Sequence, residues 1–139
     1  MSDIGRDIRT YLQTKTAVTN LVGTRIFPRM MPQGETLPAV VFSLIGSTSE
    51  PRLLGASGGV RALVQLDCYA ETHIACNDLG EQIRLALHGY SGTAGNSTIE
   101  AMLEAKRELF DAPPDARAVP AYRVSLDFEI WHNETIPTF

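Results

Sequence analysis

Apolar side chains recur at helical spacing in two parts of this chain, and both parts are predicted helices. One spans residues 3–14, where Asp3 stands in position to cap the first turn. The longer one spans residues 72–87, with Thr72 as its cap and a single apolar stripe along it. A short helical piece between them ends at Gly23, a common residue just past a helix end.

Strict alternation of apolar and polar positions predicts strands over residues 61–69 and 122–131. Residues 39–45 form a near-continuous apolar run, for which we expect burial by a helix on one face and a neighbouring subunit on the other. A short strand is predicted over residues 24–28, ending at a proline. Residues 97–110 are predicted to form a strand as well, although periodicity alone does not separate strand from helix there.

Turn-forming residues predict the connections. Residues 46–59 read as a long polar loop, residues 88–96 as a turn-rich connector and residues 111–120 as a proline-rich loop. We therefore expect an α+β fold, with an N-terminal helix and one long helix packed on one face of a mainly antiparallel sheet of four to five strands. The organisation predicted is a single domain over residues 1–139, with residues 133–139 as a short C-terminal tail.

Composition narrows the classes of function. The chain of 139 residues has 44% hydrophobic residues, 20% charged residues and a formal net charge of −4. A negative charge argues against binding that neutralises phosphates, which needs clustered Lys and Arg. The longest apolar run, residues 39–42, is far too short for a membrane helix, so we expect no membrane partner and synthesis in the cytoplasm.

Gly55-Ala56-Ser57-Gly58-Gly59 matches the G-x-S-x-G pattern of a nucleophilic serine. That pattern requires a strand before it and a helix after it, whereas here a predicted strand follows. We therefore interpret the segment as a hairpin tip and not as a catalytic site.

Cys68, His73 and Cys76 lie close together, but a structural zinc site needs a fourth ligand and another spacing. Cys68 is predicted to be a buried thiol, because it lies on the apolar side of its strand. His88, at the end of the long helix, is expected to interact with the helix dipole. The sequence thus predicts no catalytic residue, no metal and no cofactor, and we expect a protein that is not an enzyme.

The order of several segments resembles the tail-completion, or tail-terminator, family of long-tailed phages, prophages and gene transfer agents. The resemblance runs from the helix around Ile8 to Trp131, and it rests on the combined order and spacing of six segments. These are LVGTRIFP at residues 21–28, PQG at 32–34, LPAVVF at 37–42, VQLDCYA at 64–70, the long helix over 72–87 and YRVSLDF at 122–128.

The resemblance implies a structural virion protein made in the host bacterial cytoplasm. Such a protein forms a ring, usually a hexamer, at the head-proximal end of the tail tube. The ring stops tube polymerisation and joins the tail to the head. Its partners are copies of itself, the tail tube protein and a head-closure or connector protein, with DNA only in transit through the lumen.

A ring needs a heterologous interface, in which one patch meets a different patch on the next copy. We expect this interface on sheet edges and on the two loops 46–59 and 111–120. The candidate residues are Glu50, Arg52, Leu53, Leu54, Pro113, Pro114 and Arg117. An acidic lumen would repel DNA phosphates. Its candidate residues are Asp67, Glu71 and Glu129.

Two alternatives stay open at this point. One is another neck component, a head-closure or adaptor protein, which shares this size but uses a different fold. The other is a small cytoplasmic enzyme or ligand-binding domain. A deep pocket with converging polar groups would favour that last class.

Overall fold

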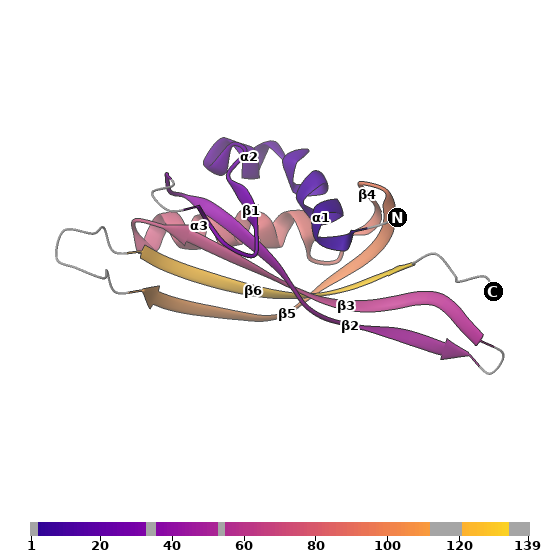
Figure 1. Ribbon diagram of the computed structural model, residues 1–139. Helices are drawn as coiled ribbons and strands as arrows, with labels where there is room; N and C mark the ends of the chain where they lie inside the picture. The colour runs from indigo at the N-terminus through magenta and orange to yellow at the C-terminus, as the bar shows by residue number, and fades with distance from the viewer. Residues whose placement is uncertain (1–2, 33–35, 53–54, 112–120, 134–139) are drawn as a thin grey trace.

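A computed structural model describes residues 3–32, 36–52, 55–111 and 121–133. Over these residues the chain forms helices and strands in the following order: α1 (Ile4–Gln13), α2 (Thr16–Val22), β1 (Ile26–Pro28), β2 (Ala39–Arg52), β3 (Gly55–Ala70), α3 (His73–Leu87), β4 (Ser91–Ala94), β5 (Ser97–Asp111) and β6 (Ala121–Asn133). The helices gather on one side of a long twisted sheet (Figure 1). This arrangement agrees with the expected α+β class.

The sheet differs in detail from the expected one. It has six strands in the order β1-β2-β3-β6-β5-β4, not four to five. β1 runs parallel to β2, and the other neighbours are antiparallel, so the sheet is mixed. The strand missed by the sequence reasoning is β4, which lies within the connector 88–96 and pairs with the start of β5. The predicted strand over residues 97–110 is confirmed as β5, which ends at Asp111.

The prediction of a loop over residues 46–59 is wrong. β2 and β3 pair continuously from Ala39↔Tyr69 to Arg52↔Gly55, with irregularities in the register at Leu44/Gly46 and Ser49/Pro51. Backbone groups make these ladder bonds, so a sequence rich in Gly, Ser and Thr extends the strands without an alternating apolar pattern. The result is a long β2–β3 hairpin, hereafter the arm.

α1 and α3 begin at side-chain caps, and a glycine follows the end of α2 and of α3. Asp3 accepts a hydrogen bond from the backbone N–H of Arg6 at 3.2 Å, and Thr72 accepts one from Ala75 at 3.1 Å. Each cap satisfies one of the N–H groups that a helix start leaves unpaired. Gly23 ends α2 with φ 59°, and Gly89 follows α3 with φ 79°, conformations that glycine adopts without steric cost.

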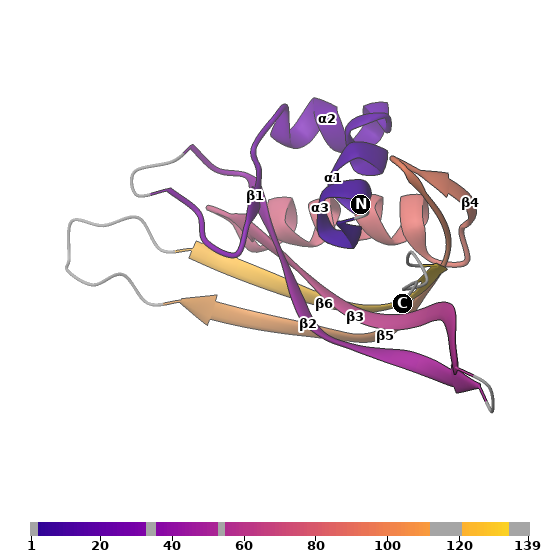
Figure 2. The ribbon, with the colours of Figure 1, turned by 45° about the vertical axis from the view of Figure 1, so that its right-hand side comes forward.

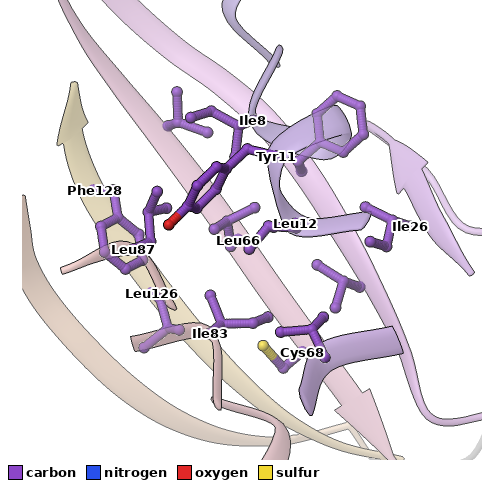
Figure 3. Packing of buried hydrophobic residues seen from close by; sticks show 14 of the residues in the cluster. Ile8, Tyr11, Leu12, Ile26, Leu66, Cys68, Ile83, Leu87, Leu126 and Phe128 are labelled. Carbon is purple, nitrogen blue, oxygen red and sulfur yellow. The ribbon is translucent and has the colours of Figure 1, made fainter. Parts of the chain in front are cut away.

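One hydrophobic core fills the space between the helices and the covered face of the sheet (Figure 3). α1 contributes Ile8 and Leu12, and α3 contributes Ile83 and Leu87, all fully buried. The sheet contributes alternate residues of β3 and β6, among them Leu66 and Phe128. Alternation therefore predicted correctly which face of these strands is covered.

The two hairpin ends of the sheet point in opposite directions (Figures 1 and 2). The arm projects from one end, past the helices. β5 and β6 reach toward the other end, beside the start of α3, where the His73 and Tyr122 rings lie 6.0 Å apart. Along the strand direction, β2 and β3 thus extend the sheet at one end, and β5 and β6 extend it at the opposite end.

Candidate assembly surfaces

The face of the sheet opposite the helices, hereafter the open face, is polar. It consists of the residues that alternate with the core positions of three strands. They are Arg61, Leu63, Gln65, Asp67 and Tyr69 of β3, Arg123, Ser125, Asp127, Glu129 and Trp131 of β6, and Glu100, Met102, Ala105, Arg107 and Leu109 of β5.

Hydrogen bonds order the centre of the open face. The Gln65 amide donates to the Ser125 hydroxyl at 2.7 Å and to the Asp67 carboxylate at 3.1 Å. Arg107 makes a bidentate pair with Asp127, at 2.8 and 3.1 Å. Fork-shaped pairs of this kind have fixed geometry as well as charge attraction. The open face is therefore an ordered polar surface across β3, β6 and β5.

A pair of carboxyl groups lies beside this network. Glu104, at a register irregularity of β5, forms a hydrogen bond with Glu129, and this bond is the main reason that the pKa of Glu104 is raised. Partial desolvation and repulsion by Glu129 raise it further, and Arg61 opposes them. Arg61 itself contacts Glu129 at 3.0 Å. A groove of about 350 Å³ runs across this place, with Ile45 among its other lining residues.

Two of the three candidate lumen residues lie on the open face. Asp67 is 9% exposed and is bonded to Gln65, whereas Glu129 is partly exposed. Glu71 lies beyond the end of β3 and is exposed. The structure thus brings Asp67 and Glu129 to one surface, although Asp67 is more deeply buried than a lumen role suggests.

The interface candidates fall on the arm and outside the described residues. Glu50 and Arg52 belong to the last part of β2. Leu53 and Leu54 lie outside the described residues, as do Pro113, Pro114 and Arg117. The first group therefore belongs to a strand of the arm, where the sequence reasoning placed a loop.

Both outer strands of the sheet are covered along only part of their length. β1 pairs with β2 over Val40 to Phe42, and the Arg29 N–H donates to the Phe42 carbonyl at 2.8 Å. Beyond that point, no described strand pairs with the outer edge of residues 43–52. We call this segment the β2 free edge. Unpaired strand edges are ready templates for another strand.

The outer edge of β5, on the opposite side of the sheet, is likewise covered along only part of its length. β4 covers the first residues of β5, after which Ala101 exchanges backbone bonds with Gly89 and Tyr90. The Leu103 N–H then donates to Nδ1 of His88 at 2.9 Å. Within the described chain no strand pairs with the outer edge of residues 104–111, which we call the β5 free edge. His88, expected only to face the helix dipole, thus marks where this edge begins.

Exposed apolar side chains concentrate on these edges. Leu44 and Ile45 on the β2 free edge are 52% and 54% exposed, and Leu109 and Phe110 on the β5 free edge are 39% and 54% exposed. Sequence reasoning assigned Leu44 and Ile45 to a buried run and did not single out the other two. The sequence feature that could have indicated these exposed residues is the presence of apolar residues at the ends of strands whose central residues already supply the core.

The serine pattern and the Cys/His group that were considered from the sequence as a catalytic site and a zinc site do not form such sites among the described residues. Residues 55–59 belong to β3, so Ser57 is on a strand and not on a hairpin tip or a strand-to-helix turn. Cys68 is fully buried, as predicted, and burial raises the pKa of its thiol well above the usual value. The Cys76 thiol donates to the Cys68 carbonyl at 3.1 Å. Among the described residues no three His, Cys, Asp or Glu side chains group as metal ligands.

A cavity of about 620 Å³ lies in the helical layer between the α1–α2 turn and the end of α3. The Tyr11 and Tyr90 rings pack there with centroids 4.3 Å apart, and the Lys15 ammonium lies 4.9 Å from the Tyr11 ring centroid. The Tyr11 hydroxyl donates to the Ala86 carbonyl. Burial, and secondarily Tyr90, raise the pKa of Tyr11. The hydrogen bond from Tyr11 to Ala86 joins α1 to α3.

No helix in the described part of the chain is both long enough and apolar enough to cross a membrane. No curated protein matches the sequence. In fold, the chain is similar to a protein chain of the virion of a native gene transfer agent (GTA) particle, with a TM-score of 0.62 and 15% identity. The similarity covers 91% of this chain and 92% of the other.

The family model described as tail completion protein gp17 matches residues 6–133, which is nearly all of the chain and includes all the strands named above. The resemblance stated from the sequence is thereby confirmed. The chain belongs to the tail completion protein gp17 family, a family of phage-tail structural proteins.

Proposed function

We propose that this protein forms a ring, a hexamer by analogy with its family, at the head-proximal end of a tail tube. There it stops tube polymerisation and joins the tail to a head-closure or connector protein. The observation that carries this proposal is the family match over residues 6–133. In the proposal the protein works through surfaces and not through a reaction.

The structure supports a head-to-tail ring because its two sheet margins differ. A ring interface is heterologous, so each subunit must present two unlike surfaces that face neighbours. The β2 free edge and the β5 free edge lie on opposite margins of one sheet, separated by β3 and β6. In the same proposal, Glu50 and Arg52 of the arm contact a neighbouring protein, together with Leu53 and Leu54. Pro113, Pro114 and Arg117 are the second set of interface candidates.

The open face is the surface that we assign to the lumen, with the helices outside. Its formal charge is negative: the acids Asp67, Glu100, Asp127 and Glu129 outnumber the bases Arg61, Arg107 and Arg123 by four to three. A surface of this sign repels phosphates and lets DNA pass without tight contacts. Glu71 would add to this charge where β3 ends.

Electron microscopy of particles made without this protein tests the role. A tube that lacks its terminator continues to polymerise, so we expect overlong tails of variable length and heads without tails. Re-supplying the protein from a plasmid should restore uniform tails. Tails of normal length in its absence would overturn the proposal. Normal-length tails that fail to join heads would favour the alternative of a head-closure or adaptor protein.

A further inference from the structure

Each copy has two free edges, so in a ring the free edge of one copy can pair with the other free edge of the next copy. We propose that residues 43–50 of β2 pair antiparallel with residues 105–111 of β5 in the adjacent copy, with Leu44 opposite Phe110. This inference rests on the proposed ring. It names the partner of each edge and the register between them.

The lengths of the two edges limit the possible registers. On one copy the β2 free edge starts beside Pro28, where β1 ends, because Arg29 turns away after bonding to Phe42. On the other copy the β5 free edge starts at Glu104, because His88 occupies the backbone N–H of Leu103. An added strand must fit between these two stops. If the whole β5 free edge of one copy pairs with β2 of the adjacent copy, residues 110–111 of β5 lie beside residues 43–44 of β2.

The exposed apolar residues meet in this register and in few others. Leu44 lies opposite Phe110, both more than half exposed in the single chain. Ile45, at the register irregularity, lies beside Leu109. Met30, 78% exposed just after β1, stands next to the end of the added strand. Large exposed apolar residues on soluble proteins often mark contacts with other chains.

The face alternation of the two strands agrees with this pairing. Leu44 is the partner of Val64 and Phe110 is the partner of Tyr122, so both project to the helix side of the sheet. Past the irregularity in β2 the register moves by one residue, which places Ser47 opposite Glu108 and Ser49 opposite Lys106. Ser47 and Ser49 pair with Ala62 and Val60, again on the helix side. Glu108 and Lys106 pair with Val124 and Leu126, on that same side.

Cysteine cross-linking in assembled particles tests the register. Ser49 and Lys106 are exposed, and residues directly opposite in an antiparallel pair have Cα atoms about 4.5–5.5 Å apart, within reach of a disulfide. The variant carries both Ser49→Cys and Lys106→Cys. Within one chain the two positions are three strand spacings apart across the sheet, about 14 Å, and they are also offset along it, because Ser49 is level with His132 of β6 and Lys106 with Leu126. A disulfide can therefore form only between copies. The native cysteines are buried and should not take part.

After mild oxidation, the double variant should run on a non-reducing gel as a ladder up to the closed ring, with most chains linked. A mixture of the two single variants should stop at dimers. The out-of-register control combines Ser49→Cys with Ser91→Cys on β4, and it should not link. Ser47→Cys with Glu108→Cys is a second in-register pair, in case the first disturbs assembly.

Tail length in the same preparations separates the two proposals. Uniform tails with neither in-register pair linked would overturn the register and leave the ring in place. Linking of the Ser91 control instead would also overturn it. Tails that stay uniform when the gene is deleted would remove the ring proposal, and this pairing with it.

Discussion

Asp7 of α1 and Ser97 of β5 are joined by a hydrogen bond between a buried carboxylate and a buried hydroxyl, across ninety residues of sequence. The same carboxylate accepts the backbone N–H of Asn96 at 3.1 Å. Gly95, with φ 56°, lies so close that a Cβ there would collide with Asp7. α1 is thereby fixed to the β4–β5 turn.

Asp7→Ala should destabilise the protein by about 2–3 kcal/mol. The substitution leaves the buried Ser97 hydroxyl and the part-buried Asn96 N–H without their acceptor, and unmade bonds to charged groups are costly. Urea unfolding of both proteins measures the difference. Asp78→Ala on the exposed side of α3 is the control, with an expected effect within about 0.5 kcal/mol. Equal losses for the two variants would contradict the role of Asp7.

Glu104→Gln should change how stability depends on pH. Folding raises the pKa of Glu104 above its usual 4.5, so the folded protein binds this proton more tightly than the unfolded chain. The stabilisation is complete below pH 4.5 and is lost as pH rises through the folded pKa. Relative to wild type, the Gln variant should therefore be more stable at pH 7 than at pH 4.5. Urea midpoints at both pH values measure this, and parallel curves would count against it.

Glu81→Gln is the matched comparison, because its sign is opposite. A hydrogen bond from Arg84 lowers the pKa of Glu81 below 4.5. Its stabilisation is present above pH 4.5 and is lost as pH falls through the lower folded pKa. The Gln variant should therefore lose stability relative to wild type at neutral pH and recover it in acid.

Phe110→Asp should leave the protein folded and abolish assembly. The side chain is 54% exposed, so the core does not depend on it, but the substitution places a charge in the proposed contact with Leu44. Circular dichroism checks the fold, and electron microscopy of tails checks assembly. Ile74→Asp changes a residue on α3 that is 74% exposed and should leave tails normal. Normal tails with Phe110→Asp would argue against an interface on this edge.

Leu53→Asp combined with Leu54→Asp tests the two leucines between β2 and β3 in the sequence. We expect a folded monomer that no longer joins tails to heads, because an apolar contact with a neighbouring protein is lost. Complementation of a gene deletion measures the fraction of infectious or DNA-transferring particles, which should fall at least tenfold. Ile74→Asp with Leu85→Asp on α3 provides a control of equal charge. Full complementation by the Leu53/Leu54 variant would remove these residues from the interface.

The covered face of the sheet could be predicted from sequence because packing there is encoded in side chains. Leu66 and Phe128 alternate with polar residues, and the structure buries both fully. The caps Asp3 and Thr72 were predictable for a similar reason, since a short polar side chain must satisfy the first helix N–H groups.

The arm and β4 could not be predicted, because their pairing relies on backbone bonds among Gly, Ser and Thr residues that also suit turns. The free edges were missed for another reason. Where a strand loses its neighbour depends on where β1 and His88 end their contacts, and no local pattern records that. The candidate lumen acids were predicted from charge alone, and only the fold shows that Asp67 and Glu129 share a face.

Cryo-electron microscopy of the neck tests the central claim most directly. The account predicts a closed ring of copies of this chain between the tail tube and the head connector. The helices should face outward, the open face inward, and β2 of each copy should lie against β5 of the next. Density for this chain elsewhere in the particle, or a ring whose lumen is lined by basic residues, would contradict the account.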